Sequence, residues 1–351
     1  MWDADGSGRE RLVINLGRRA GGRHPLAFSP DGKFLACATT KDIHLFDLIR
    51  GVKAGMIKNA HGEETLRVEF GPDGKTLFSA GESSARIIRN KQEEGAETRP
   101  QLRMWDVAER TLIREFIDTA FEPGDCMFSL SRDGHTLVSM QSNIVLIWDV
   151  ATGKVTRSIP GYWVPSAAGD KTIRIRYVVR STGIAVSPDA MTIATADDPL
   201  HSVTLWDVAT GQRRPDFPDA HSAPVEGLAC SIDGSRIATG GWDGIVHLWE
   251  SAGGKHVRAL VLGDSFPCQV RSVAFARHGK TLAAGGQDRK AGQDRGVVRI
   301  WDTTSGEHRL ESRTGQDVAK VALSNDGNKL AVATSSFSEF REKREVAHER
   351  S

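Results

Sequence analysis

The stretch HSAPVEGLACSIDGSRIATGGWDGIVHLWE, residues 221–250, holds the pattern that decides the fold. Its apolar residues alternate with polar ones in three short runs, at residues 225–230, 236–240 and 245–249. The turn residues Asp233-Gly234 and Asp243-Gly244 separate the runs. Period-two patterning between Gly and Asp turns predicts three β-strands rather than helices.

The same pattern repeats along the chain. The first turn recurs seven times, as Asp31-Gly32, Asp73-Gly74, Asp133-Gly134, Asp189-Ala190, Asp233-Gly234, His278-Gly279 and Asp326-Gly327. The closing aromatic-acid pair recurs as Phe46-Asp47, Trp105-Asp106, Trp148-Asp149, Trp206-Asp207, Trp249-Glu250 and Trp301-Asp302, with a further Trp2-Asp3. The shortest spacing between successive pairs is 43 residues, which is the period of a four-stranded propeller blade.

These periodic turns and Trp-Asp pairs resemble the WD-repeat family of β-propellers over almost the whole chain. The resemblance implies an all-β fold, a seven-bladed propeller of four-stranded antiparallel blades. It also implies a structural role for His221, Thr239, Asp243 and Trp249, which in this family hydrogen-bond to hold the Trp strand. Only the fifth copy keeps all four residues, and the His before the first strand survives elsewhere only at His61. The Ser-Pro-Asp-Gly-Lys type of turn resembles bacterial members of the family.

One propeller domain is expected over residues 1–351. Its blade copies are expected at residues 25–57, 61–116, 125–159, 183–214, 221–260, 270–310, and in a closing blade of 317–350 plus 1–16. The N-terminal strand Arg11 to Leu16 is expected to pair with the C-terminal strands and close the ring, which removes open sheet edges. The third strand of that blade would come from Phe340 to Glu349, a charged segment equally compatible with a frayed tail.

Composition predicts a cytoplasmic protein without a cofactor. A chain of 351 residues with 39% hydrophobic residues can bury a large core. The balance of 46 basic and 45 acidic residues gives no overall attraction to nucleic acid or anionic membrane. No apolar run is long enough to span a bilayer. The four scattered cysteines indicate buried thiols, and the histidines show no metal-ligand spacing.

Three insertions are the main functional signal, around residues 83–103, 161–180 and 287–298. Successive connections of an up-and-down blade alternate between faces, so all three insertions are expected on one face. Together they carry twelve basic and six acidic residues, a net charge of +6 on a chain whose total is +1. The partner-binding candidates on this face are Arg86, Arg89, Tyr162, Trp163, Arg174, Arg176, Trp242, Arg289 and Lys290.

The alternative for these charges is an ordinary solvated surface, with Tyr162 and Trp163 packing their own loop. Trp242 is either an exposed contact or is folded over the neighbouring blade. His221, Thr239 and Asp243 are the residue types of a hydrolase triad, but the family pattern explains them as buried polar bracing. The inner strands, such as residues 26–28 and 273–275, are apolar and predict no acidic or His side chains in the channel.

The expected function is a non-catalytic scaffold that binds a protein or peptide, as a monomer away from membranes. Two alternatives remain open at this point. The basic face could bind nucleic acid, which steep salt dependence would reveal. The chain could also be the regulatory portion of a larger signalling protein.

Overall fold

The computed structural model describes residues 1–4, 13, 25–89, 92–117, 126–141, 144–160, 183–197, 201–214, 217, 221–263, 268–290 and 293–334. Within these ranges the regular secondary structure consists of β-strands, and the strands form seven antiparallel sheets. Five sheets have four strands and two have three. The prediction of an all-β propeller with four-stranded antiparallel blades is therefore confirmed for five sheets.

The strands of the first four sheets follow in chain order. They are β2 (Leu26–Phe28), β3 (Phe34–Ala38), β4 (Ile43–Asp47) and β5 (Val52–Ile57); β6 (Thr65–Phe70), β7 (Thr76–Arg89), β8 (Gln92–Asp106) and β9 (Leu112–Phe116); β10 (Cys126–Leu130), β11 (Thr136–Gln141), β12 (Ile144–Asp149) and β13 (Lys154–Pro160); and β14 (Ile184–Val186), β15 (Thr192–Asp197) and β16 (Ser202–Asp207).

The remaining three sheets complete the set. They are β17 (Val225–Cys230), β18 (Arg236–Gly241), β19 (Ile245–Glu250) and β20 (His256–Val261); β21 (Cys268–Phe275), β22 (Thr281–Lys290), β23 (Gln293–Asp302) and β24 (His308–Thr314); and β25 (Val318–Leu323) and β26 (Lys329–Thr334) with β1 (Trp2–Asp3).

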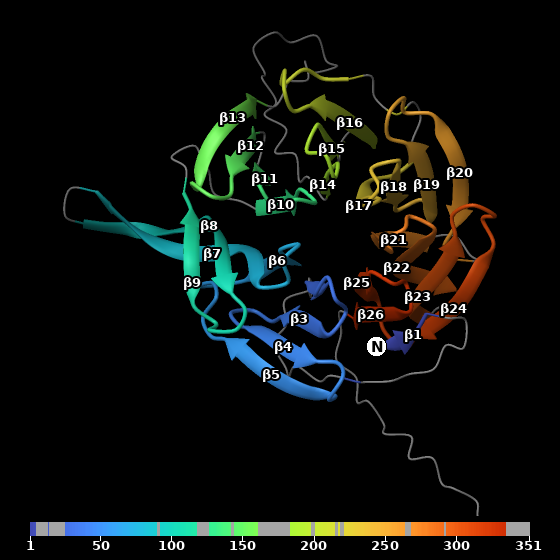
Figure 1. Ribbon diagram of the computed structural model, residues 1–351, viewed down its shortest axis with the longest axis horizontal. Coiled ribbons are helices and arrows are strands. Elements are labelled where there is room, and N and C mark those ends of the chain that lie inside the picture. The colour runs from blue at the N-terminus through green and yellow to red at the C-terminus, as the bar shows by residue number, and fades with distance from the viewer. Residues whose placement is uncertain are drawn as a thin grey trace, which may run out of the picture.

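The sheets stand around a common centre; β25 is innermost in the last sheet, and the first strand in chain order is innermost in the others (Figure 1). Seven hydrophobic clusters hold them, each between neighbouring sheets. One cluster joins Ala331 of β26 to Leu26, Leu35 and Phe46 of the first sheet. The period-two pattern thus buries one set of side chains against each neighbouring sheet, which explains why a single blade cannot be stable alone.

The last sheet is built from both ends of the chain. Trp2 pairs with Leu330 and Asp3 with Lys329, antiparallel to β26. An N-terminal strand was expected here, but it was placed at Arg11 to Leu16; β1 lies nine residues earlier in the chain, and of that segment only Val13 is among the described residues. The proposed third strand at residues 340–349 lies outside the described residues.

Buried hydroxyl groups explain why the third strands keep their Trp. The indole Nε1 atoms donate hydrogen bonds of 2.8–3.0 Å to a Ser or Thr of the second strand. The pairs are Trp105 with Ser79, Trp148 with Ser139, Trp206 with Thr195 and Trp249 with Thr239. In the sixth blade, Ala284 stands two residues after the pairing partner of Trp301, where the other blades place the hydroxyl. A buried indole N–H usually finds such an acceptor, so in these four blades the polar contact helps to fix the strand pairing.

The Asp-Gly turns are self-contained caps. In the first, Asp31 accepts hydrogen bonds from the Ser29 hydroxyl and the backbone N–H of Lys33. The residue after the Asp adopts a left-handed conformation, with φ of +67° at Gly32. Ala190 takes the same conformation in the fourth blade, with φ of +57°, which costs energy for any residue with a Cβ.

Candidate interaction face and central channel

The insertions at residues 83–103 and 287–298 continue the sheets as hairpins rather than forming loops. β7 and β8 stay paired from Thr76 opposite Asp106 to Arg89 opposite Gln92. Their distal part projects beyond the ring, past the end of β9 (Figure 1). β22 and β23 stay paired as far as Lys290 opposite Gln293. Both hairpins connect second to third strands, so they lie on the same face as the turn that carries Trp242.

The structure tests few of the predicted contact residues at the level of side chains. Arg86 and Arg89 belong to β7, and Arg289 and Lys290 belong to β22, near the tips of the two hairpins. Their side chains are outside the description. Tyr162, Trp163, Arg174 and Arg176 all lie in residues 161–182, outside the described residues.

Trp242 is the predicted contact residue whose side chain is described. It follows β18 and is 42% exposed. Its indole Nε1 donates a 2.8 Å hydrogen bond to Oε2 of Glu226 on β17, and its backbone N–H donates to the carbonyl of Pro224. The indole is therefore held toward the innermost strand of its own blade and presents an apolar ring to solvent.

A β-bulge places Glu226 in this position. In β17 the pairing passes from Val225 to Gly227, so Glu226 is the extra residue. β21 has the same irregularity at Arg271, between Val270 and Ser272. Such bulges re-aim a side chain without breaking the strand. Two charged side chains thereby reach the lining of the central cavity from neighbouring blades.

The four residues of the structural prediction form one continuous chain of hydrogen bonds. His221 Nδ1 lies 3.0 Å from Asp243 Oδ2, His221 Nε2 lies 2.8 Å from Thr239 Oγ1, and Trp249 Nε1 donates to the same Oγ1 at 3.0 Å. Burial opposes ionisation of Asp243, but hydrogen bonds from His221 and from backbone N–H groups lower its pKa. The His221 side chain is 0% exposed, so no substrate can reach it, and bracing of the blade accounts for the geometry.

The second blade keeps part of this arrangement. His61 Nε2 lies 2.8 Å from Ser79 Oγ, which also accepts the Trp105 indole. His61 Nδ1 is buried and has no hydrogen-bond partner within the described residues. Burial and the nearby Arg103 lower the pKa of His61 to about 3, so the ring is neutral.

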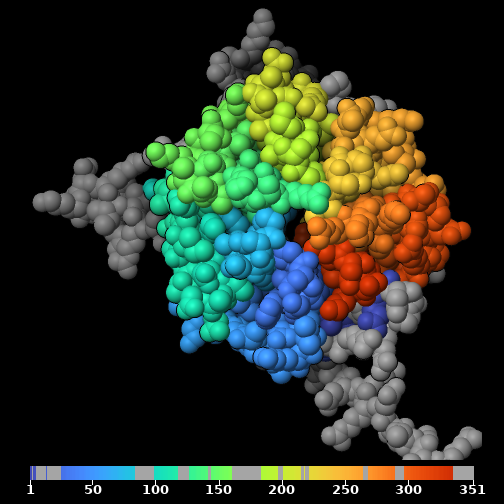
Figure 2. All heavy atoms as spheres, viewed as in Figure 1, coloured from blue at the N-terminus to red at the C-terminus, as the bar shows by residue number. Residues whose placement is uncertain are grey.

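The central channel is more polar than the sequence predicted. It encloses a cavity of about 510 Å³, and the surface is hollowed at this place (Figure 2). Charged side chains from four of the inner strands line it, which corrects the expectation of an apolar channel without acidic groups. They are Arg67, Glu69, Glu226, Arg271 and Lys320. The apolar residues 26–28 and 273–275 line other parts of the wall. The charges could not be found from the repeat pattern because each blade places different residues at these positions.

A comparison with known protein families identifies the same repeats in the sequence. The model of the family described as "WD domain, G-beta repeat" matches residues 215–250 and 261–302. The chain contains WD40 repeats. The first matched repeat spans β17 to β19 and includes the four hydrogen-bonded residues His221, Thr239, Asp243 and Trp249. The second spans β21 to β23.

The relatives that match this chain are distant. It is 26% identical to a guanine nucleotide-binding protein subunit beta from Arabidopsis thaliana, over 60% of this chain and 53% of that protein. It is 21% identical to autophagy-related protein 16 from Arabidopsis thaliana, over 71% of this chain and 49% of that protein. A guanine nucleotide-binding protein subunit beta from Zea mays is 21% identical over 89% of this chain and 77% of its own length. The chain thus spans about half the length of the first two relatives.

The described residues contain neither a membrane-spanning helix nor a metal-binding cluster. No described helix is long and apolar enough to cross a membrane. Among the same residues, no group of three or more His, Cys, Asp or Glu side chains is placed to hold a metal ion. Among the cysteines, Cys37, Cys126 and Cys268 are buried and Cys230 is partly buried.

Proposed function

We propose that this chain is a non-catalytic scaffold that binds a protein or peptide partner on the face carrying Trp242 and the two extended hairpins. The observation that carries the proposal is the Trp242 indole, 42% exposed and fixed by its hydrogen bond to Glu226. A large aromatic ring with one satisfied polar atom and an exposed apolar face is typical of interface anchors. Fixing the ring in advance also lowers the entropy lost on binding.

The proposal includes a single propeller domain over residues 1–351 whose ring is closed with seven blades. The β1–β26 pairing and the cluster between β26 and the first sheet support closure. It also includes a monomeric, cytoplasmic protein that uses no cofactor. Several relatives are named as beta subunits, and so as parts of larger assemblies, which supports binding to another protein.

Charge on this face supports a partner with acidic groups. Arg86, Arg89, Arg289 and Lys290 lie near the hairpin tips, and Tyr162, Trp163, Arg174 and Arg176 belong to the insertion at residues 161–180, which is predicted on the same face. Opposite charges at the rim of an interface mainly raise the association rate and the specificity.

The test is a pull-down from nuclease-treated source lysate with the wild type, Trp242→Ala and a control, Ile113→Ala. Ile113 on the outer strand β9 is 46% exposed, close to the exposure of Trp242, but lies away from the proposed face. Proteins retained by the wild type and the control but lost with Trp242→Ala would support the docking face. Identical retention by all three would refute it.

The same experiment separates the other candidates. A catch that disappears on nuclease treatment and weakens steeply with salt would favour nucleic-acid binding through the basic face. Retention of domains of one signalling assembly would favour a regulatory portion of a larger signalling protein.

A further inference from the structure

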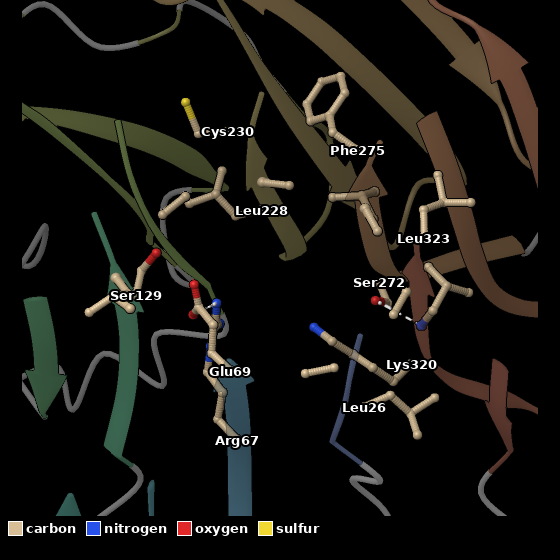
Figure 3. A pocket seen from close by; sticks show the side chains of 18 of the residues that line it. Leu26, Arg67, Glu69, Ser129, Leu228, Cys230, Ser272, Phe275, Lys320 and Leu323 are labelled. Carbon is tan, nitrogen blue, oxygen red and sulfur yellow. Dashed lines mark hydrogen bonds and ion pairs between the residues drawn. The ribbon is translucent and has the colours of Figure 1, made fainter. Parts of the chain in front are cut away.

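Three charged side chains meet inside the central channel. Arg67 and Glu69 extend from β6, and Lys320 extends from β25 toward them across the cavity (Figure 3). Arg67 Nη2 lies 3.7 Å from Glu69 Oε2, which is an ion pair but too long for a hydrogen bond. The Arg67 guanidinium also lies 5.6 Å from the centre of the Phe128 ring.

These groups leave hydrogen-bonding capacity unused. Glu69 Oε2 is buried without a hydrogen-bond partner within the described residues. The Lys320 ammonium forms neither a hydrogen bond nor an ion pair with any residue that the structure describes, yet it faces the cavity (Figure 3). Buried polar groups are normally satisfied, so groups of this kind around a cavity indicate a ligand that would complete them.

Two other charged residues of the inner strands, Glu226 and Arg271, are already engaged, whereas Arg132 and Arg277 line the cavity from the turns after β10 and β21. Glu226 accepts the Trp242 indole N–H at 2.8 Å, and Arg271 lies 3.4 Å from Asp317. Two carboxylates, Glu69 and Glu226, act on Lys320, but neither forms an ion pair with it among the described residues. Burial and the nearby Arg67 lower the pKa of Lys320 to about 8, while Glu69 and Glu226 act in the opposite direction.

We propose that the central channel binds a small organic anion between the Lys320 ammonium and the Arg67 guanidinium, with Glu69 accepting a hydrogen bond from a hydroxyl or ammonium group of the same molecule. The anionic group is a carboxylate or a phosphate, which Arg and Lys bind by charge-assisted hydrogen bonds. A cavity of about 510 Å³ has the size of a metabolite or cofactor site. This site is independent of the docking face, because its ligand is a free small molecule inside the ring.

The probe is pyridoxal 5′-phosphate, which carries a phosphate and an aldehyde. The uncharged Lys320 amine adds to the aldehyde and water leaves; borohydride then delivers hydride to the imine, water supplies a proton, and a stable secondary amine marks the residue. Pyridoxal, which has no phosphate, is the comparison reagent; its free hydroxymethyl group partly closes on the aldehyde as a hemiacetal, so every rate ratio is divided by the ratio at the surface lysines. Peptide mass spectrometry measures labelling at Lys320 and, as internal controls, at the exposed Lys75 and Lys255.

We expect the phosphate reagent to label Lys320 about tenfold faster than pyridoxal, which corresponds to ~1.4 kcal/mol of anion binding. Lys75 and Lys255 should show a far smaller preference. Glycerol 3-phosphate or malate should protect Lys320, and the stronger of the two identifies phosphate or carboxylate as the anionic group. Glycerol, which has the hydroxyls without the charge, should not protect.

Two variants test the second cation. Arg67→Met should bring the reagent preference at Lys320 down to that of the surface lysines, whereas Arg67→Lys should keep most of it. Thermal unfolding checks that each variant is folded. Equal labelling of wild-type Lys320 by both reagents, no labelling at all, or a preference unchanged in Arg67→Met would overturn the proposal. Loss of partner capture in Trp242→Ala would leave this result unchanged, so the two proposals fail separately.

Discussion

Replacing Thr239 by Val tests how much the buried hydrogen-bond chain of the fifth blade contributes to stability. His221 Nδ1 is hydrogen-bonded to Asp243, and its Nε2 is hydrogen-bonded to the Thr239 hydroxyl. The same hydroxyl oxygen accepts from Trp249. Val has nearly the shape of Thr but no hydroxyl, so His221 Nε2 and Trp249 Nε1 would both stay buried without a hydrogen-bond partner. At about 1–3 kcal/mol for each of the two groups, the free energy of unfolding should fall by about 2–6 kcal/mol.

Two further Thr→Val changes provide matched controls. Thr195 receives one indole hydrogen bond, from Trp206 at 2.9 Å, so its replacement should cost about 1–3 kcal/mol. The Thr204 hydroxyl is buried and has no partner among the described residues. Its replacement removes an unsatisfied polar group, so we expect no loss and a gain of up to about 1 kcal/mol.

Urea unfolding followed by tryptophan fluorescence measures all three variants at constant pH, with the slope of the transition checked for each. The expected order of stability is Thr204→Val, then Thr195→Val, then Thr239→Val. If Thr239→Val proves as stable as Thr204→Val, the hydrogen-bond chain contributes nothing and the bracing role assigned to it is wrong.

Three other predictions address protonation, backbone strain and thiol reactivity. The pKa of His61 is about 3 in the folded chain and 6.5 ordinarily, so between these values the unfolded chain binds more protons and the free energy of unfolding should fall as pH drops from 6.5 toward 3. Urea unfolding of His61→Asn should show a weaker fall with pH, and a fall equal to that of the wild type would contradict this. Ala190→Gly should raise the free energy of unfolding by about 0.5–1 kcal/mol, because φ at this turn is +57°; thermal unfolding measures it, with Ala60→Gly as a buried control expected to destabilise. Burial raises the pKa of the Cys37 thiol to about 12, so iodoacetamide should modify it in urea but not in the native protein at pH 8; rapid native modification would show that the blade opens.

The sequence predicts the blades well because their cause is local and repeated. The turn at Asp233 closes on its own Ser231 and backbone groups, and in four blades the Trp has its hydroxyl acceptor on the adjacent strand of its own sheet. The β1–β26 pairing was harder to locate, because a strand of two residues carries no period and its partners lie over 300 residues away. Residues 83–103 were expected as a loop, whereas β7 and β8 continue as a hairpin; their mixed polar composition hides the alternation that marks a half-buried strand.

The candidate site was predicted less completely than the fold. Trp242 stood out as an unusual residue in a short turn, but its hydrogen bond to Glu226 depends on a β-bulge that the sequence pattern does not reveal. The sequence does not predict the proximity of Arg67, Glu69 and Lys320, for a different reason. These residues come from blades distant in sequence, and only the circular arrangement brings their side chains into one cavity.

The pairing of β1 with β26 has a mechanical consequence. Two residue pairs connect the N-terminal strand to the last sheet, whereas β17 and β18 share a ladder of five. A tensile force applied through residue 1 would therefore peel this short ladder first and leave the inner blades folded. If the chain were tethered at that end, a low force would detach β1 from β26. The other sheets would remain folded under the same force.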